Sequence, residues 1–176
     1  MTNGPISVVP YDPEWPRRFE SERELLERVL GRWLEGGVHH VGSTAIPGIA
    51  AKPIIDMVAG VRELQQAREA FEPLREHSYH YAPHRPGIAH HFWKPSERLS
   101  ETTHGLHLTE PGSDLWRERL AFRDALRADR ALLAEYEALK LRLAREHGDD
   151  PGLYLDGKRD FVIRVLARAG IELGRR

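Results

Sequence analysis

The sequence has 176 residues, a formal net charge of -1 at neutral pH and no cysteine. Its length and composition predict a single domain, 1–176, and exclude a disulfide framework, a thiolate nucleophile and a cysteine-bound zinc ion. No apolar run approaches the roughly 18 residues that would cross a bilayer. The sequence also lacks a basic stripe of the kind that predicts nucleic-acid binding. We therefore expect a cytoplasmic protein with neither membrane nor nucleic acid as partner, in which any phosphate-bearing ligand is held by a local cluster.

The N-terminal third of the chain predicts a strand, a helix and two further strands. Residues 6–10 predict a short strand, and Asp12-Pro13 is typical of a helix start. The helix is expected to continue to Gly36-Gly37. One apolar face recurs along it, formed by Trp15, Phe19, Leu26, Leu30 and Trp33. Strands are then expected at 38–42 and directly after Lys52-Pro53.

The remainder of the chain changes from mixed structure to helices. Residues 62–77 predict a helix. In residues 78–112 apolar and polar side chains alternate, with breaks at Pro and Gly, which predicts three strands with loops. Helices are expected over 113–129, 130–148 and 153–170. This order predicts an α+β fold, with a mixed β-sheet core and flanking helices over about 1–111 and a helical C-terminal layer over about 112–176.

One apolar segment, from His39 to Val61, carries an isolated acid. On a strand, Asp56 and Val58 face one side and Met57 the other, and both sides are largely apolar, which predicts a central strand. An ionised carboxylate there costs free energy unless it is paired or binds a cation. Asp56 is therefore the expected catalytic or cation-binding residue, although it could instead accept hydrogen bonds at the end of the strand.

The same segment holds polar groups suited to a phosphate. Gly42, Ser43 and Thr44 follow a strand, where glycine lets the backbone approach a ligand and hydroxyl groups can donate hydrogen bonds. Lys52 adds a positive charge before the Asp56 strand. We expect these residues to line one pocket for a small phosphate-bearing ligand, either a nucleotide or a CoA-like ester.

The segment also resembles the signature of the GrpB family, H-V-G-S-T-[AS]-[VI]-P-G-[LIM]-x-[AS]-K-P-[IV]-[IL]-D-[ILM]. The resemblance continues in "VVPYDPEWPRRFE", "THGLHL" and "FRDALR", and from Tyr136 to Lys140 and Tyr154 to Val162, so it covers about 8–169. It implies a nucleotidyltransferase-like fold and a related domain fused to dephospho-CoA kinase in some bacteria. It does not imply a substrate or a partner enzyme.

The nucleotidyltransferase pattern is only partly present. Val41, Gly42 and Ser43 match its first part and Asp56 its first carboxylate, but Val58 occupies the position of the second carboxylate. Two-metal transfer holds its ions about 4 Å apart with shared carboxylates. Two classes of function therefore stay open. One is a divergent, metal-assisted nucleotidyl or phosphoryl transferase, and the other is a non-catalytic ligand-binding or accessory domain.

Histidines could replace the missing ligands. His107 lies on an alternating segment where the superfamily places its third carboxylate, and His40 precedes the Gly42 turn. A set of Asp56, His107 and His40 would suit a divalent metal, with Mn²⁺, Ni²⁺ or Zn²⁺ favoured over Mg²⁺ because imidazole is a poor ligand for hard cations. The alternative is that these histidines are hydrogen-bonded residues of the core or of a sheet edge.

Two further lysines complete the predicted ligand site. Lys140 and Lys158 each follow a tyrosine by four residues, at Tyr136 and Tyr154. By analogy with the superfamily, whose helical layer closes over the nucleotide, both lysines are expected to face the phosphate groups. The alternative is that this spacing only stacks each lysine over the next helical turn, with Lys140 either solvated or paired with an acid of the core.

Overall fold

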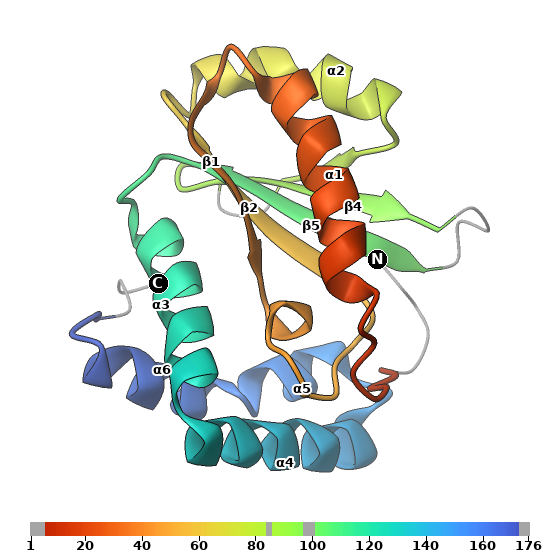
Figure 1. Ribbon diagram of the computed structural model, residues 1–176, viewed down its shortest axis with the longest axis vertical. Helices are drawn as coiled ribbons and strands as arrows, with labels where there is room; N and C mark the ends of the chain where they lie inside the picture. The colour runs from red at the N-terminus through yellow and green to blue at the C-terminus, as the bar shows by residue number, and fades with distance from the viewer. Residues whose placement is uncertain (1–5, 84–85, 97–100, 173–176) are drawn as a thin grey trace.

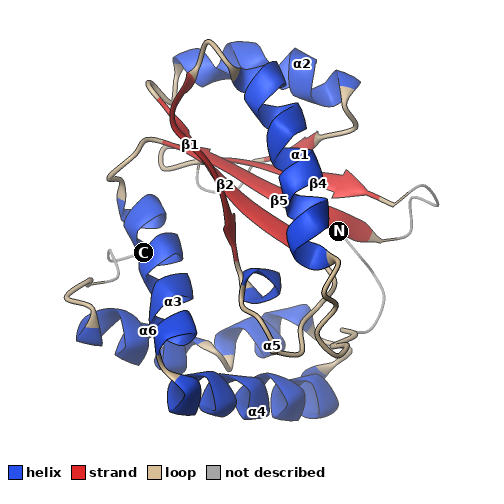
Figure 2. Ribbon diagram, in the orientation of Figure 1, coloured by secondary structure: helices blue, strands red, loops and turns tan. Residues whose placement is uncertain are grey.

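The computed structural model describes residues 6–83, 86–96 and 101–172, and it confirms the α+β class with a mixed sheet. The five strands form one sheet in the order β1-β2-β5-β4-β3, and Figure 2 draws the strands in red. The strands are β1 (Leu34–Val41), β2 (Ile55–Val61), β3 (His80–Ala82), β4 (His90–Pro95) and β5 (Thr102–Thr109). Strands β2 and β5 are parallel, and the other neighbours are antiparallel.

The helices form two groups, one packed against the sheet and one that meets the sheet mainly through α3 (Figure 1). The first group is α1 (Trp15–Leu30), the short η2 (Gln66–Ala70) and α2 (Phe71–Glu76). The second group is α3 (Asp114–Ala128), α4 (Arg130–His147), α5 (Pro151–Asp156) and α6 (Arg159–Arg168). The 3-10 helix η1 (Ser43–Ala45) is one turn long and lies between the end of β1 and the second group (Figure 1).

Strand register divides the sheet into two faces. The core face carries Ile55, Met57 and Leu106, which join the side chains of α1 and α2 in the main hydrophobic core. The opposite face, here called the site face, carries Asp56 and Val58 of β2. Cross-strand partners share a face, so the row through Asp56 runs Val41, Asp56, Gly105, Trp93 and His80.

Helix α3 covers part of the site face because two glycines leave room for it. A Cβ atom on Gly36 would lie 2.8 Å from the Trp116 ring, and one on Gly60 would lie 2.8 Å from the Cα of Gly36. Trp116 therefore lies directly against β1, where it also meets the His39 ring edge-on at 5.0 Å. This packing places α3 beside Asp56.

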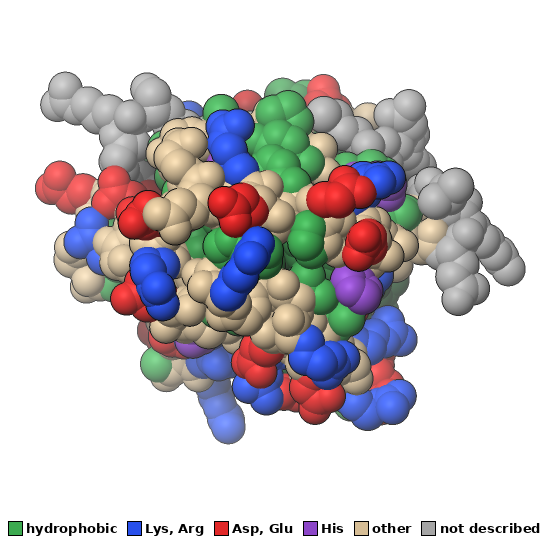
Figure 3. All heavy atoms as spheres, turned by 90° about the horizontal axis from the view of Figure 1, so that it is seen from above, with side chains coloured by type: hydrophobic (Ala, Val, Ile, Leu, Met, Phe, Trp, Pro, Cys, Tyr) green, Lys and Arg blue, Asp and Glu red, His purple; other side chains and the backbone are tan. Residues whose placement is uncertain are grey.

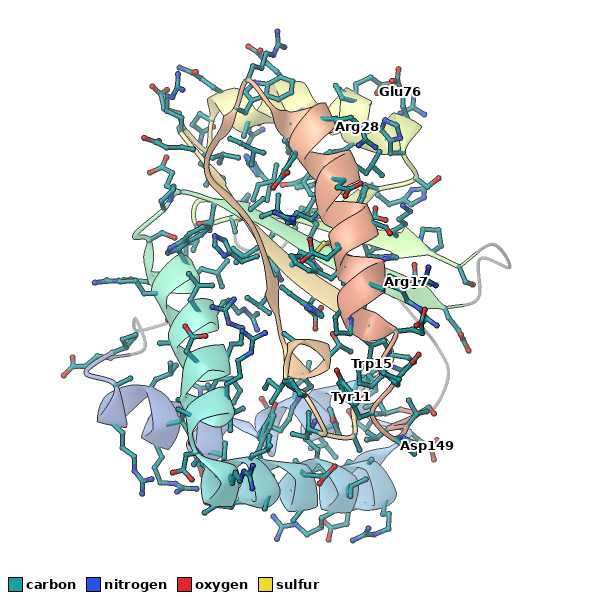
Figure 4. All side chains as sticks on the ribbon, viewed as in Figure 1. Tyr11, Trp15, Arg17, Arg28, Glu76 and Asp149 are labelled. Atoms are coloured by element: carbon teal, nitrogen blue, oxygen red, sulfur yellow. The ribbon has the colours of Figure 1, made fainter. Side chains whose placement is uncertain are left out.

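The two long C-terminal helices agree with the sequence prediction. The Ser113 hydroxyl accepts a hydrogen bond from the Trp116 backbone N–H at the start of α3, and the Asp129 carboxylate caps α4 in the same way. Figure 4 shows Tyr11 and Trp15 together at the start of α1, where their rings meet edge-on at 5.4 Å. Within the described residues, no helix is both long and apolar enough to cross a membrane.

Several predicted elements are shorter or broken. The expected strand at 6–10 contributes one bridge, between Val9 and Ala51, and α1 ends at Leu30 instead of reaching 36. The expected helix at 62–77 is η2 followed by α2. The expected helix at 153–170 is two helices, α5 and α6. It breaks at Gly157, where the Leu143 side chain packs so closely that a Cβ atom would lie 2.4 Å from it.

Candidate functional site

The site begins at the turn after β1, where a glycine meets the Asp56 carboxylate. Gly42 has a φ of 70°, a left-handed conformation that favours glycine. A Cβ atom on Gly42 would lie 2.6 Å from Asp56 Oδ2, and one on Gly105 would lie 2.8 Å from Asp56 Oδ1. The carboxylate therefore lies between two positions that tolerate no side chain.

Asp56 carries a desolvated carboxylate surrounded by cations. Burial raises the pKa of Asp56, while the charges of Arg119, Lys158 and Lys52 act in the opposite direction. None of the ion pairs among the described residues includes this carboxylate. We call Lys52, Arg119 and Lys158 the cation cluster, because they come from three separate elements and act on the same acid.

The break between α5 and α6 brings Lys158 to the site. Lys158 is the N-cap residue of α6, and its ammonium lies over the Tyr154 ring, 4.2 Å from the ring centroid. Burial lowers the pKa of Lys158 to about 8, although the Asp56 charge opposes this shift. The predicted spacing of Tyr154 and Lys158 is therefore a contact in the structure, made across a helix break.

Helix α4 contributes a tyrosine that closes the site and a lysine that does not enter it. Tyr136 is buried, and its hydroxyl interacts with Ser43 and lies within electrostatic reach of Asp56. Lys140 is also buried and donates a hydrogen bond to the Ala50 carbonyl. Glu137 accepts a hydrogen bond from the Ala50 N–H at 2.7 Å. Together Lys140 and Glu137 hold the segment before β2, so we assign Lys140 to support of the site.

Thr44 and His40 form a buried link behind the turn. The Thr44 hydroxyl donates to the Ile54 carbonyl at 2.9 Å, so it accepts from His40 Nε2 at 3.0 Å. Burial, followed by the charges of Arg127 and Arg123, lowers the pKa of His40 to about 4. His40 pairs with Met57 across the strands and stacks on Phe19 of α1 at 4.7 Å, so it lies on the core face, opposite Asp56.

The predicted metal set is not assembled. His107 does share the site face with Asp56, but it lies two residues beyond Gly105 along β5, beside Val58, and its ring stacks on His91 at 4.6 Å. Across 6–83, 86–96 and 101–172, no group of three histidine or acidic side chains is placed to hold a metal ion. A metal at Asp56 would need ligands from a bound molecule.

Arg119 was not among the predicted site residues. It extends the stripe of α3 that includes Leu115, Phe122 and Leu126, at steps of three or four residues. Leu126 is fully buried, and Leu115 nearly so. An arginine within an otherwise apolar helical stripe is the sequence signal that would have indicated it.

A separate cavity lies at the other end of β2 and β5. It has a volume of about 370 Å³ and is lined by residues that include Leu64, Ile88, Glu110 and Ser113. Glu110 accepts a hydrogen bond from the Leu64 backbone N–H at 3.0 Å. Since Asp56 lies near the start of β2 and this cavity lies beyond the end of that strand, the two are distinct sites.

Comparison with known proteins places the chain in a family. A family model described as "GrpB protein" matches residues 5–168. The glutamate-rich protein GrpB of Alkalihalophilus pseudofirmus is 35% identical over 94% of this chain and 97% of its own length. The crystal structure of the conserved protein GrpB from Enterococcus faecalis is 29% identical, with a TM-score of 0.84 over 93% of this chain and 96% of that chain.

Two other similarities concern part of a longer protein or the fold alone. A dephospho-CoA kinase of Mycolicibacterium paratuberculosis is 36% identical over 68% of this chain, which corresponds to 28% of that protein. The Cid1 poly(U) polymerase is 10% identical, with a TM-score of 0.43 over 68% of this chain and 41% of that chain. The resemblance drawn from the sequence, including the relation to dephospho-CoA kinases, is confirmed.

Proposed function

The chain belongs to the GrpB family, and on that premise we propose that it binds a small phosphate-bearing molecule, a nucleotide or a CoA-like ester, at Asp56. One observation carries this proposal. Three cations from separate elements act on a single desolvated carboxylate, and none of the ion pairs in the described part of the chain neutralises them. The cation cluster has more positive charge than Asp56 can balance, so it favours an anionic ligand.

The chemistry of the donors fits phosphate oxygens. Lysine and arginine bind phosphate through charge-assisted hydrogen bonds, and the Ser43 hydroxyl lies at the same turn. The formal net charge is -1, and on the face seen from the α2 end the described acidic and basic side chains are interspersed (Figure 3). That face therefore offers no comparable attraction for an anion, which supports recognition by the local cluster.

We propose that Asp56 holds a divalent cation together with the phosphate groups of the ligand. Such a site is made of oxygen ligands, which favours Mg²⁺ or Mn²⁺ over Ni²⁺ or Zn²⁺. A protein-only set of Asp56, His107 and His40 is not supported, since His40 lies on the opposite face. The cation would neutralise the repulsion between the carboxylate and the phosphates.

Val58 favours binding over conventional two-metal transfer. It occupies the place on the site face where a second carboxylate would share the metal ions, and its side chain is fully buried. We therefore propose a ligand-binding or accessory role in the cytoplasm, in support of a partner enzyme. Metal-assisted nucleotidyl or phosphoryl transfer is the second candidate, because the cation cluster would also stabilise negative charge that develops on a transferred phosphoryl group.

Calorimetric titration with ATP and with CoA, each with and without Mn²⁺, tests the proposal. We expect Mn²⁺-dependent binding of at least one ligand that is lost in Asp56→Asn, whose neutral side chain suits a position where burial disfavours the ionised form. Arg119→Ala should weaken binding, whereas the control Arg117→Ala, two residues away on α3 and paired with Asp114, should not. Binding that is absent in the wild type, or unchanged in Asp56→Asn, would contradict the proposal.

A further inference from the structure

Beside Asp56, the site face carries an unusual concentration of aromatic rings. His80 and Trp93 stack at 4.8 Å with 29° between their planes, and His91 and His107 stack at 4.6 Å with 14° between theirs. We call these four residues the aromatic face. Trp93, His91 and His107 are half-buried, and His80 is exposed. A half-buried tryptophan on a sheet keeps part of its apolar ring in water, and a planar ligand would cover that part.

This half of the site face lies beyond the helix that covers the other half. Helix α3 packs against β1 and β2. Helices α1 and α2 reach β4 from the core face, through the Glu22–Lys94 ion pair and through Phe71, which meets Phe92 edge-on. Within the described residues, the rings of Trp93 and His80 therefore lie on the side of the sheet away from α1 and α2.

The aromatic face and the phosphate site belong to one row of the sheet. Asp56 pairs with Gly105, Gly105 with Trp93, and Trp93 with His80. Because residue 105 has no side chain, no side-chain atom of that residue stands between the carboxylate and the indole ring. Two strand spacings separate Asp56 from Trp93, or about 10 Å. The Asp56 carboxylate itself stands over Gly105, so a sugar beside that carboxylate would connect a phosphate at the cation cluster with a ring at Trp93.

We propose that the aromatic face binds the nucleobase of a nucleotide whose phosphates lie at the cation cluster. This rests on the proposed function and narrows its ligand to a molecule with both an anionic group and a planar ring. The cation cluster would bind the phosphate groups and the stacked rings would bind the base. A nucleotide carries both groups in one molecule. Stacking on aromatic side chains tolerates different bases, because every base has a π-face.

Titration with ATP and with inorganic tripolyphosphate, both with Mn²⁺ present, separates the two parts of the proposal. In Trp93→Leu we expect the ATP affinity to fall roughly five- to hundredfold while the tripolyphosphate affinity stays within about twofold. Trp93→Phe, which keeps a ring, should recover most of the ATP affinity. Lys158→Met should weaken both ligands, because it removes charge from the phosphate site.

His80→Ala provides a second variant, because His80 is exposed and its loss leaves the core intact. It should weaken ATP by about two- to fivefold and leave tripolyphosphate unchanged. Equal loss of both ligands in Trp93→Leu, or no loss of either, would overturn the nucleobase assignment while the phosphate site stands. Affinity that rises with the length of an oligoadenylate would also overturn it in favour of a polymer. If the wild type binds none of ATP, CoA and tripolyphosphate, the proposed function itself fails.

Discussion

The two faces of the sheet surround a carboxylate in opposite ways. On the core face, Glu22 accepts hydrogen bonds from the Tyr79 hydroxyl at 2.8 Å and from Lys94 Nζ at 2.7 Å, and His104 Nε2 lies 3.8 Å away. On the site face, Asp56 has cations within electrostatic reach, but it belongs to none of the ion pairs in the described part of the chain. A carboxylate that is hydrogen-bonded to protein groups, such as Glu22, stabilises the fold. A carboxylate near cations with which it forms no ion pair, such as Asp56, is suited to binding a ligand together with those cations.

Removal of Glu22 should give the largest loss of stability. Glu22→Ala leaves Lys94 and Tyr79 without their partner between α1 and the sheet, which should lower the free energy of unfolding by about 3 kcal/mol. Urea denaturation measures this loss. The control Glu24→Ala, exposed on the same helix, should change it by less than about 0.5 kcal/mol.

Asp56→Asn should behave in the opposite way to Glu22→Ala. Since burial raises the pKa of Asp56, ionisation of this carboxyl costs more in the folded state than in the unfolded chain. The neutral amide should therefore preserve stability while it removes ligand binding. If Glu22→Ala were no more destabilising than Glu24→Ala, the contrast between the two faces would be wrong.

The glycines beside Asp56 should show an intermediate effect through a double-mutant cycle. Gly105→Ala places a methyl group 2.8 Å from Asp56 Oδ1, and overpacking of this kind costs about 1–3 kcal/mol. In an Asp56→Ala background the methyl group meets empty space, so most of the cost should disappear. Urea denaturation of the wild type, the two single variants and the double variant gives the coupling free energy.

Additive free energies in that cycle would show that Gly105 is required for some reason other than the Asp56 carboxylate. Gly42→Ala is a less clean test of the same contact, because its φ of 70° adds backbone strain to the clash with Oδ2. Gly105 is therefore the position that reports on the carboxylate alone.

The sequence predicted well those features that local periodicity determines. Alternation in 54–61 correctly separated Asp56 and Val58 from Met57, and it indicated a strand covered on both faces. The 3.6-residue period and the capping residues gave α3 and α4 within one residue of their ends. The order of the predicted elements correctly gave the α+β fold, and the resemblance to the GrpB family is confirmed.

Features set by packing between distant segments were not predictable in the same way. The pairing of Val41 with Asp56 sends His40 to the core face, and no local pattern specifies that register. The break at Gly157 depends on Leu143 of a different helix. Arg119 joins the site only because α3 packs on β1 and β2, although its place in an apolar stripe was visible in the sequence.

A further expected effect is a pH dependence at Lys140, a buried cation whose hydrogen-bond acceptor is a neutral carbonyl. Burial lowers the pKa of Lys140 to about 7 from an ordinary value of 10.5. Between these values the unfolded chain binds more protons than the folded one, so this group makes wild-type stability rise with pH, by up to about 1.4 kcal/mol per unit. Lys140→Met lacks this slope.

The free energy of unfolding of the wild type should therefore rise relative to that of Lys140→Met from pH 7 to pH 9. Urea denaturation of both proteins at each pH measures this change. Arg142→Met, on an exposed position of α4, serves as the control and should follow the wild type at a constant offset. Parallel curves for Lys140→Met would mean that the lysine stays charged throughout, and the carbonyl of Ala50 would then be enough to hold a buried ammonium beside the site.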